Sequence, residues 1–245
     1  PEWIWEWQDD LPSITSFMCD YVETVVRRYH RQIRRWQLTA SSNIAGLLQL
    51  NEDDQLWLTA RLAETAWDVD SGLEITIGVA QPWGDYLAQE EHTCSPLIFV
   101  DNLIRAGLRL AAIDLEWIFG VMPRGTYCRD LLDASRLLDM YAMLGTPLDV
   151  TLGYPSAWTP DPLADPALSP GAGYWLSPLS PQSQAEWVRD FLKLAIGKPF
   201  VRGVTWAHWS DALPHQFPHC GLIDSSGEPK PALEAWRSIR AAHAK

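Results

Sequence analysis

Acidic side chains stand at or just past the ends of three predicted β-strands. Asp114 and Glu116 lie two residues apart in "AIDLEW", so in a strand both side chains point to one face. Asp85 follows the preceding predicted strand, and Asp211 follows the last one. Carboxyl groups that crowd in one cleft shift each other's pKa toward acid and base roles. The sequence therefore offers Glu116 with Asp85 or Asp211 as a catalytic pair.

A structural role for the same carboxylates is the simpler alternative. Glu116 would then bind a hydroxyl group of a ligand or pair with Arg124, and Asp211 would cap the turn that follows it. No spacing in the chain singles out one pair of carboxylates. Both interpretations therefore stay open at this stage.

Three histidines, His208, His215 and His219, lie close together in the sequence. Pro214 and Pro218 break the i, i+4 helical spacing by which a zinc-binding helix presents two imidazoles. The four cysteines are far apart and form no C-x-x-C pair, which predicts free and mostly buried thiols. We therefore expect no metal site and no cofactor.

The elements that must position these residues alternate along the chain. Short runs rich in β-branched and apolar residues predict strands, and stretches with apolar residues at helical spacing separate them. Such alternation is typical of an α/β fold with a parallel sheet covered by helices. The expected strands cover residues 33–40, 73–80, 110–117, 147–154 and 200–209. The expected helices cover 11–33, 53–69, 96–108, 129–145 and 180–197, the first capped by Ser13 or Thr15 and the last running from a Ser cap to Gly197.

One long stretch, residues 156–182, is rich in Pro and Gly and predicts an irregular loop after the fourth expected strand. Loops of this length are uncommon unless they line a site or are disordered. It leaves the carboxyl end of a strand, where parallel α/β barrels bind their ligands. Trp158, Tyr174 and Trp175 favour a packed lid over a floppy insertion.

The net charge of −12 argues against nucleic acid as a partner, because phosphate binding requires a positive surface. No apolar run approaches the length of a membrane span, so we expect no membrane partner either. No signal peptide is visible and the chain begins at Pro1 without a Met, so the sequence leaves the localisation unknown.

The last expected strand and the tail carry the most specific pattern. A strand ending in Gly-Val-Thr-Trp is followed by Ser-Asp, a Leu-Ile-Asp turn, and Pro-Lys-Pro-Ala at the start of a helix. This order resembles glycoside hydrolase family 10, as do "PEW", "VVRRYHRQIRRWQL" and "SPQSQAEW". The resemblance implies a TIM-barrel (β/α)8 fold with strands four to eight in this chain, in a single domain over residues 1–245. It also implies an extracytoplasmic or secreted endo-β-1,4-xylanase-like protein, with the remainder of the parent chain completing the barrel.

Both catalytic glutamates of that family are substituted. Its acid/base follows an Asn at the end of the fourth strand, and that Asn-Glu pair falls on Ala40 and Ser41. Its nucleophile follows a Thr on the seventh strand, and this position falls on Leu152, which cannot attack a sugar. The family's Trp on the eighth strand falls on Ala207, unless the alignment shifts by one residue.

Three functions remain open. The first is a degenerate barrel that binds a β-linked polysaccharide such as xylan, by stacking and hydrogen bonding, without hydrolysing it. The second is an active glycosyl hydrolase with a relocated carboxylate such as Glu116. The third is a structural scaffold. The candidate sugar-binding residues are Gln81, Trp83, Trp117, Tyr154, Trp206, His208 and Trp209.

Overall fold

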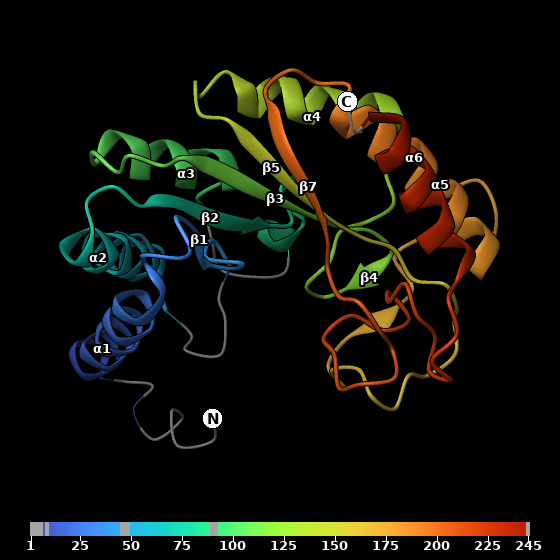
Figure 1. The fold of residues 1–245 in the computed structure, drawn as a ribbon, viewed down its shortest axis with the longest axis horizontal. Helices are drawn as coiled ribbons and strands as arrows, with labels where there is room; N and C mark the ends of the chain where they lie inside the picture. The colour runs from blue at the N-terminus through green and yellow to red at the C-terminus, as the bar shows by residue number, and fades with distance from the viewer. Residues whose placement is uncertain (1–6, 8–9, 45–49, 89–92, 244–245) are drawn as a thin grey trace. The chain divides into compact units, whose positions relative to one another are not determined.

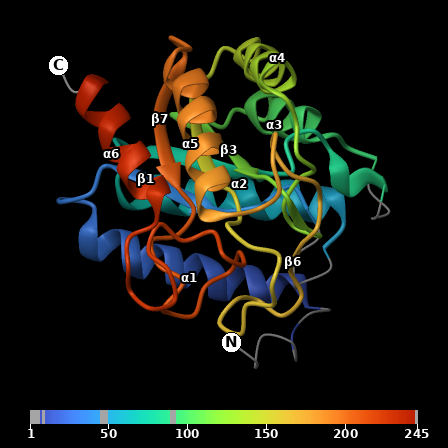
Figure 2. The same ribbon diagram turned by 90° about the vertical axis from the view of Figure 1, so that its right-hand side faces the viewer.

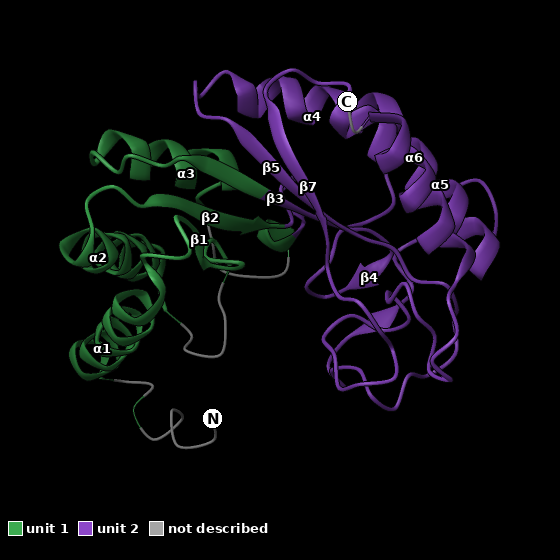
Figure 3. Ribbon diagram, viewed as in Figure 1, with its two compact units in different colours: residues 1–80, 86–114 green, residues 81–85, 115–245 purple. Residues whose placement is uncertain are grey.

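The computed structural model describes residues 7, 10–44, 50–88 and 93–243. The chain divides into two compact units, one of residues 1–80 and 86–114 and the other of residues 81–85 and 115–245 (Figure 3). The expected single domain over residues 1–245 stays a prediction, and the "PEW" motif at Pro1–Trp3 lies outside the described residues.

The first unit packs two long helices, α1 and α2, against each other beside a parallel strand pair (Figure 1). Strands β1 and β2 begin in register, with Arg35 opposite Glu74. β2 is buried from its second residue to its last, as expected for a strand covered on both faces. The elements of this unit are α1 (Leu11–Tyr29), β1 (Arg35–Thr39), α2 (Glu52–Val69), β2 (Glu74–Ala80) and α3 (Pro96–Arg105).

The second unit holds the parallel pair β5–β7 and the contacting helices α5 and α6, which lie side by side (Figure 2). A short antiparallel pair, β4 with β6, joins two of its loops. A 3₁₀ turn follows Gly84, at Asp85–Ala88. The elements of this unit are β4 (Val121–Met122), α4 (Leu131–Ala142), β5 (Leu148–Gly153), β6 (Ser169–Pro170), α5 (Pro181–Ile196), β7 (Val201–Trp206) and α6 (Pro231–His243), with β3 (Ala112–Ile118) crossing the boundary at residue 114.

The five long strands form one parallel sheet in the order β1-β2-β3-β5-β7, with a helix in each connection. Strands that neighbour each other in chain order are the arrangement of an α/β barrel, whereas a doubly wound sheet reverses its order. The expected α/β class and all five expected strands are therefore confirmed.

Side-chain hydrogen bonds to the backbone cap the first turns of α5 and α1. α5 begins at Ser180, whose Oγ accepts a hydrogen bond from the Ser183 amide at 3.0 Å, and ends at Gly197, both as expected. α1 departs from the expectation of Ser13 or Thr15. Its cap is Asp10, which accepts hydrogen bonds from the amide (3.1 Å) and the hydroxyl (2.7 Å) of Ser13. Ser13 lies inside the first turn, so it serves as a donor to the cap.

The long stretch after β5 is irregular, as predicted, and its middle packs against the rest of the second unit. Leu168, Ala172 and Leu179 are buried, and the amide of Trp175 donates to the Tyr154 hydroxyl at 2.7 Å. The expected irregular loop is therefore confirmed, and its middle is packed. Among the helices described here, none combines the length and apolar character needed to cross a membrane.

Candidate functional site

The strand pair β5–β7 presents two different faces. Trp206 packs edge-on against Trp187 of α5 and Trp236 of α6, at centroid distances of 6.2 and 5.9 Å. Leu152 lies opposite Trp206 in the register and is fully buried, so its side chain belongs to this helix-facing side. The other side, which we call the far face, carries Thr151, whose hydroxyl lies 2.8 Å from that of Thr205.

This geometry bears on the position of the nucleophile. A catalytic carboxylate in a barrel must point away from the surrounding helices, toward the interior. At the tip of β5 the far face carries Thr151 and Gly153, while Leu152 points into the core beneath α5. No acidic residue occurs between Thr151 and Ser156, so this strand end lacks a carboxylate in either register.

The end of β3 places Glu116 on the far face. The ring of Trp117 contacts Phe191 of α5 at 6.2 Å, so Glu116 and Ile118, its neighbours on either side, point the opposite way. Glu116 is largely buried, as is Asp114 two residues before it. Glu116 is thus the carboxylate that β3 contributes to the far face within the second unit.

Apolar side chains fill the far face beyond Glu116. A Cβ at Gly153 would lie 2.8 Å from Ile118 Cδ1, which shows how closely the strand tips approach each other. Ala207 packs against the apolar cluster that contains Ile118. The family resemblance would place a tryptophan at this position. The members of this cluster are Ile118, Val121, Leu168, Phe217 and Cys220. Apolar side chains from the loops after β5 and β7 therefore cover the carboxyl ends of the strands in this unit.

The end of β1, in the first unit, is also without an acidic side chain. Ser41 has a positive φ of 52°. Ser42 donates its hydroxyl to Gly78 O at 3.0 Å, and Asn43 binds both the amide and the carbonyl of Ala80 at 2.9 Å. The polar residues after β1 thus join it to β2.

Asp85 is held in a salt bridge. Its Oδ1 lies 2.6 Å from Nη2 of Arg129, its Oδ2 accepts from the hydroxyl of Thr126, and its side chain is 4% exposed. The same guanidinium lies 5.7 Å from the centroid of Trp83, over the ring. Arg129 therefore engages Asp85 and Trp83, two of the three residues that sequence analysis proposed for this strand end.

Gln81 takes an unusual backbone conformation, with φ of 45°, and is buried. Its amide nitrogen donates to the carbonyl oxygen of Pro123. Its amide oxygen is buried with no partner among the described residues. Gln81 therefore joins the end of β2 to the turn after β4, and only its oxygen is left to accept a further hydrogen bond.

The predicted sugar-binding aromatic residues separate into buried and exposed ones. Trp117 and Tyr154 are fully buried, and Tyr154 stacks on Trp187 at 5.1 Å with an interplanar angle of 7°. Burial raises the pKa of Tyr154 well above its ordinary value. Trp206 donates its indole N–H to Cys220 O at 2.7 Å. Trp117 and Tyr154 therefore lie in the core and Trp206 is half-buried, whereas Trp209 is 59% exposed and presents a free face.

Sequence analysis assigned Trp158 and Tyr174 to a packed lid, but both rings are also exposed. They meet edge to face at 6.3 Å on the loop after β5, with 44% and 51% of their surface accessible. The Pro- and Gly-rich composition around these two rings is the sequence feature that marks them as loop residues. In such a loop the packing of the chain, and not a strand, sets the positions of aromatic side chains. An exposed aromatic pair of this kind can stack on a flat ligand.

Asp211 lies at the centre of a buried polar cluster in the loops after β7. It accepts hydrogen bonds from Lys230 Nζ at 2.5 Å and from the Gly221 amide at 2.6 Å, and His208 Nε2 lies 3.0 Å from its Oδ1. Burial alone would raise the pKa of Asp211, but the hydrogen bonds from His208 and Lys230, the Lys230 charge and the Gly221 amide outweigh it and lower the pKa to about 2. Asp211 is therefore an ionised carboxylate that accepts hydrogen bonds both from the backbone of its turn and from the side chains of Lys230 and His208.

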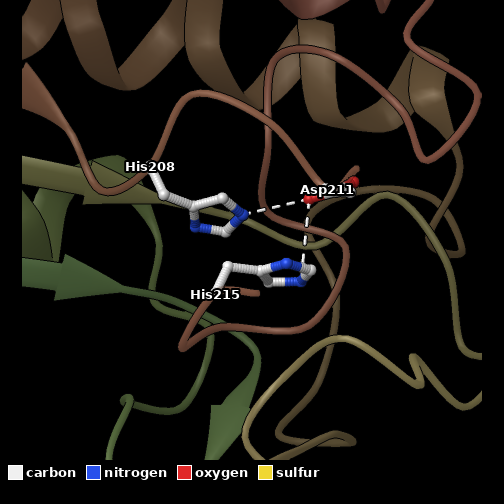
Figure 4. Close-up of side chains that lie close together, drawn as sticks. All are labelled: His208, Asp211 and His215. Atoms are coloured by element: carbon white, nitrogen blue, oxygen red, sulfur yellow. Dashed lines mark hydrogen bonds and ion pairs between the residues drawn. The ribbon is translucent and has the colours of Figure 1, made fainter. Parts of the chain in front are cut away.

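Sequence analysis predicted no metal-site geometry for these histidines, but the fold brings His208 and His215 together beside Asp211. Figure 4 shows the rings of His208 and His215 lying one over the other beside Asp211; their centroids are 4.6 Å apart with an interplanar angle of 19°. One ligand atom from each of the three residues lies within 4.8 Å of the others. Sequence spacing missed this because the proline-rich turn folds back, which replaces the helical spacing that the prolines exclude.

Comparison with known proteins shows likeness at the level of the fold. No protein-family model matches the chain, and no curated protein sequence does. The structure of native xylanase 10B from Thermotoga maritima matches 94% of this chain at 14% identity, with a TM-score of 0.60, and 67% of that chain is covered. Xylanase 10B from Thermotoga petrophila RKU-1, solved with xylobiose, matches 93% at 12% identity, with a TM-score of 0.62 and 65% of that chain covered.

A glycosidase of another family matches equally well. The catalytic domain of an Ignisphaera aggregans GH53 protein matches 94% of this chain at 18% identity, with a TM-score of 0.65 and 66% of that chain covered. This chain thus spans about two thirds of the length of each structure. It has a glycosidase-like fold that corresponds to part of a TIM barrel.

Proposed function

We propose that this chain forms the carboxyl-terminal part of a glycosidase-like barrel that binds a β-linked polysaccharide such as xylan and does not hydrolyse it. The observation that carries the proposal is the end of β5, where a retaining glycosidase needs a carboxylate. Thr151 and Gly153 occupy the far face there, Leu152 points into the core, and apolar side chains cover the strand tips. The remaining strands of the barrel would come from elsewhere in the parent polypeptide.

Exposed aromatic rings support the binding part of the proposal. Trp209 after β7 and the pair Trp158–Tyr174 after β5 lie on loops that leave the carboxyl ends of strands, where barrels bind ligands. A pyranose ring stacks on such a surface through its apolar face. The fold likeness to a xylanase solved with xylobiose makes xylo-oligosaccharides the first ligands to test.

The test is a titration of the full-length parent protein with xylohexaose, followed by intrinsic tryptophan fluorescence and calorimetry. Binding by the wild type and an affinity about tenfold lower in Trp209→Ala are expected, because the substitution removes one stacking surface. Trp57→Ala is the matched control, since Trp57 is a similarly exposed tryptophan on α2. If xylohexaose changes neither signal, the binding proposal is rejected and a scaffold role becomes the better interpretation.

A further inference from the structure

The loops after β5 and β7 bring together imidazole and carboxylate groups that the proposed function does not use. His208, Asp211 and His215 lie between β7 and α6, and Asp161 lies in the loop after β5. His208 Nε2 is 3.0 Å from Asp211 Oδ1, and His215 Nε2 is 3.9 Å from the same oxygen. His215 Nε2 is also 3.0 Å from Asp161 Oδ2. Four potential ligand atoms therefore converge from two loops.

The hydrogen bonds of His215 determine which of its nitrogens is available. Its Nδ1 lies 2.7 Å from the carbonyl oxygen of Leu213, which can only accept, so Nδ1 carries the hydrogen. In a neutral ring Nε2 then presents a lone pair to two carboxylates, Asp161 and Asp211. The same nitrogen therefore faces two carboxylate oxygens, and in a neutral ring its lone pair can bind a metal cation placed between them.

His219 has the same arrangement. Its Nε2 lies 2.7 Å from the carbonyl oxygen of Thr159, and its Nδ1 faces Asp161 Oδ2 at 3.5 Å. The backbone amide of His219 donates to that same oxygen at 2.9 Å. Asp161 is therefore oriented by a backbone amide while two imidazole nitrogens face its Oδ2. This second histidine adds a further nitrogen beside the same carboxylate oxygen.

With neutral imidazoles, the formal charges of this cluster leave an excess of negative charge. Asp161 and Asp211 contribute two negative charges, and Lys230 contributes one positive charge, which binds Oδ2 of Asp211 at 2.5 Å. Oδ1 of Asp211 accepts from the Gly221 amide at 2.6 Å and faces the histidines with its remaining lone pair. The side chains of Asp161, Asp211 and His215 are each 5% exposed or less, so water screens the remaining charge poorly.

We propose that His208 Nε2, Asp211 Oδ1 and His215 Nε2 bind a zinc ion, with Asp161 Oδ2 as the fourth ligand. Two imidazoles with carboxylate oxygens form a ligand set that suits Zn²⁺. Tetrahedral zinc with bonds of 2.0–2.1 Å needs ligand atoms about 3.3 Å apart. Three of the six separations among these atoms, 3.0, 3.9 and 3.0 Å, lie near that value, and the ligand atoms of His208, Asp211 and His215 all lie within 4.8 Å of one another, so zinc binding would draw the side chains slightly closer. Such an ion would fasten the loop after β5 to the loop before α6.

The test uses the full chain, stripped of metal with a chelator and titrated with Zn²⁺ by calorimetry. One zinc ion per chain is expected, with metal content checked by mass spectrometry after dialysis. Cobalt(II) gives an independent signal, since tetrahedral N/O coordination produces an intense visible absorption that octahedral surface binding lacks. This measurement on the wild type does not depend on whether any variant folds.

Variants then locate the site. His215→Ala and His208→Gln are expected to lower zinc affinity at least tenfold, and Asp161→Asn also lowers it, while circular dichroism verifies the fold. His243→Ala is the matched control, because His243 is an exposed histidine on α6 outside the cluster. Failure of the wild type to bind one equivalent, or equal affinity in His215→Ala and wild type, overturns the proposal. Oligosaccharide binding is measured separately, so loss of one activity leaves the other testable.

Discussion

Lys230 Nζ lies 2.5 Å from Oδ2 of Asp211, and both side chains are almost completely buried. The same ammonium donates to Ser156 Oγ and to His219 O, each at 2.9 Å. One side chain at the start of α6 therefore holds the loop after β5 and the loop after β7 in place. Hydrogen-bonded on three sides, the buried charge of Lys230 is compensated rather than exposed to an apolar interior.

Removal of Lys230 tests this arrangement. Lys230→Met leaves the Asp211 carboxylate buried without its cation, which is expected to lower the free energy of unfolding by about 3–5 kcal/mol. Urea denaturation in the presence of a chelator measures this change without any contribution from metal. Lys198→Met is the control, because Lys198 pairs with Asp139, a largely exposed carboxylate, and should cost about 1 kcal/mol or less. Equal costs for the two variants would contradict the central role of Lys230.

The second prediction is that a glutamate costs different amounts of stability on the two faces of β5. Leu152→Glu places a charge in the core beneath α5, where no partner is available in the described contacts, and is expected to destabilise the protein by more than about 4 kcal/mol. Thr151→Glu places the same group on the far face and should cost about 1 kcal/mol or less. Denaturation curves of both variants measure the difference. A stable Leu152→Glu protein would show that Leu152 faces the interior of the barrel after all.

The thiols of Cys128 and Cys220 support a third prediction. Burial raises the pKa of Cys128 to about 12, and burial also raises the pKa of Cys220 well above its ordinary value. At pH 8 both are therefore almost entirely protonated, and the thiol form is a poor nucleophile. Iodoacetamide should modify the partly exposed Cys19 of α1 much faster than these two, and all of them similarly in urea. Peptide mass spectrometry measures the rates, and rapid native labelling of Cys220, which is fully buried, would contradict the prediction.

A fourth prediction concerns catalysis by Glu116. If the chain binds polysaccharide without cleaving it, the full-length parent protein releases no reducing sugar from xylan or mixed β-glucans. Glu116→Gln should then behave like the wild type in both binding and turnover. Measurable release by the wild type that disappears in Glu116→Gln would instead assign catalysis to the end of β3. Circular dichroism of both proteins separates lost activity from lost structure.

Local patterns in the sequence determined the elements of this fold. Period-two and period-3.6 arrangements of apolar residues depend on neighbours along the chain, so all five strands and the helices between them could be predicted. The cap at Ser180 and the stop at Gly197 follow from side chains that bind the adjacent backbone. The lack of a carboxylate after Thr151 is likewise a property of the sequence alone.

Only the tertiary structure decided which of these residues meet. The exposure of Trp209, the burial of Trp117 and Tyr154, and the direction of Leu152 depend on helices and loops far away in sequence. His208 and His215 stack because a proline-containing turn brings them back together, and Asp161 reaches them from another loop. Contacts of this kind arise from packing between distant segments, for which neither strand nor helix periodicity carries a signal.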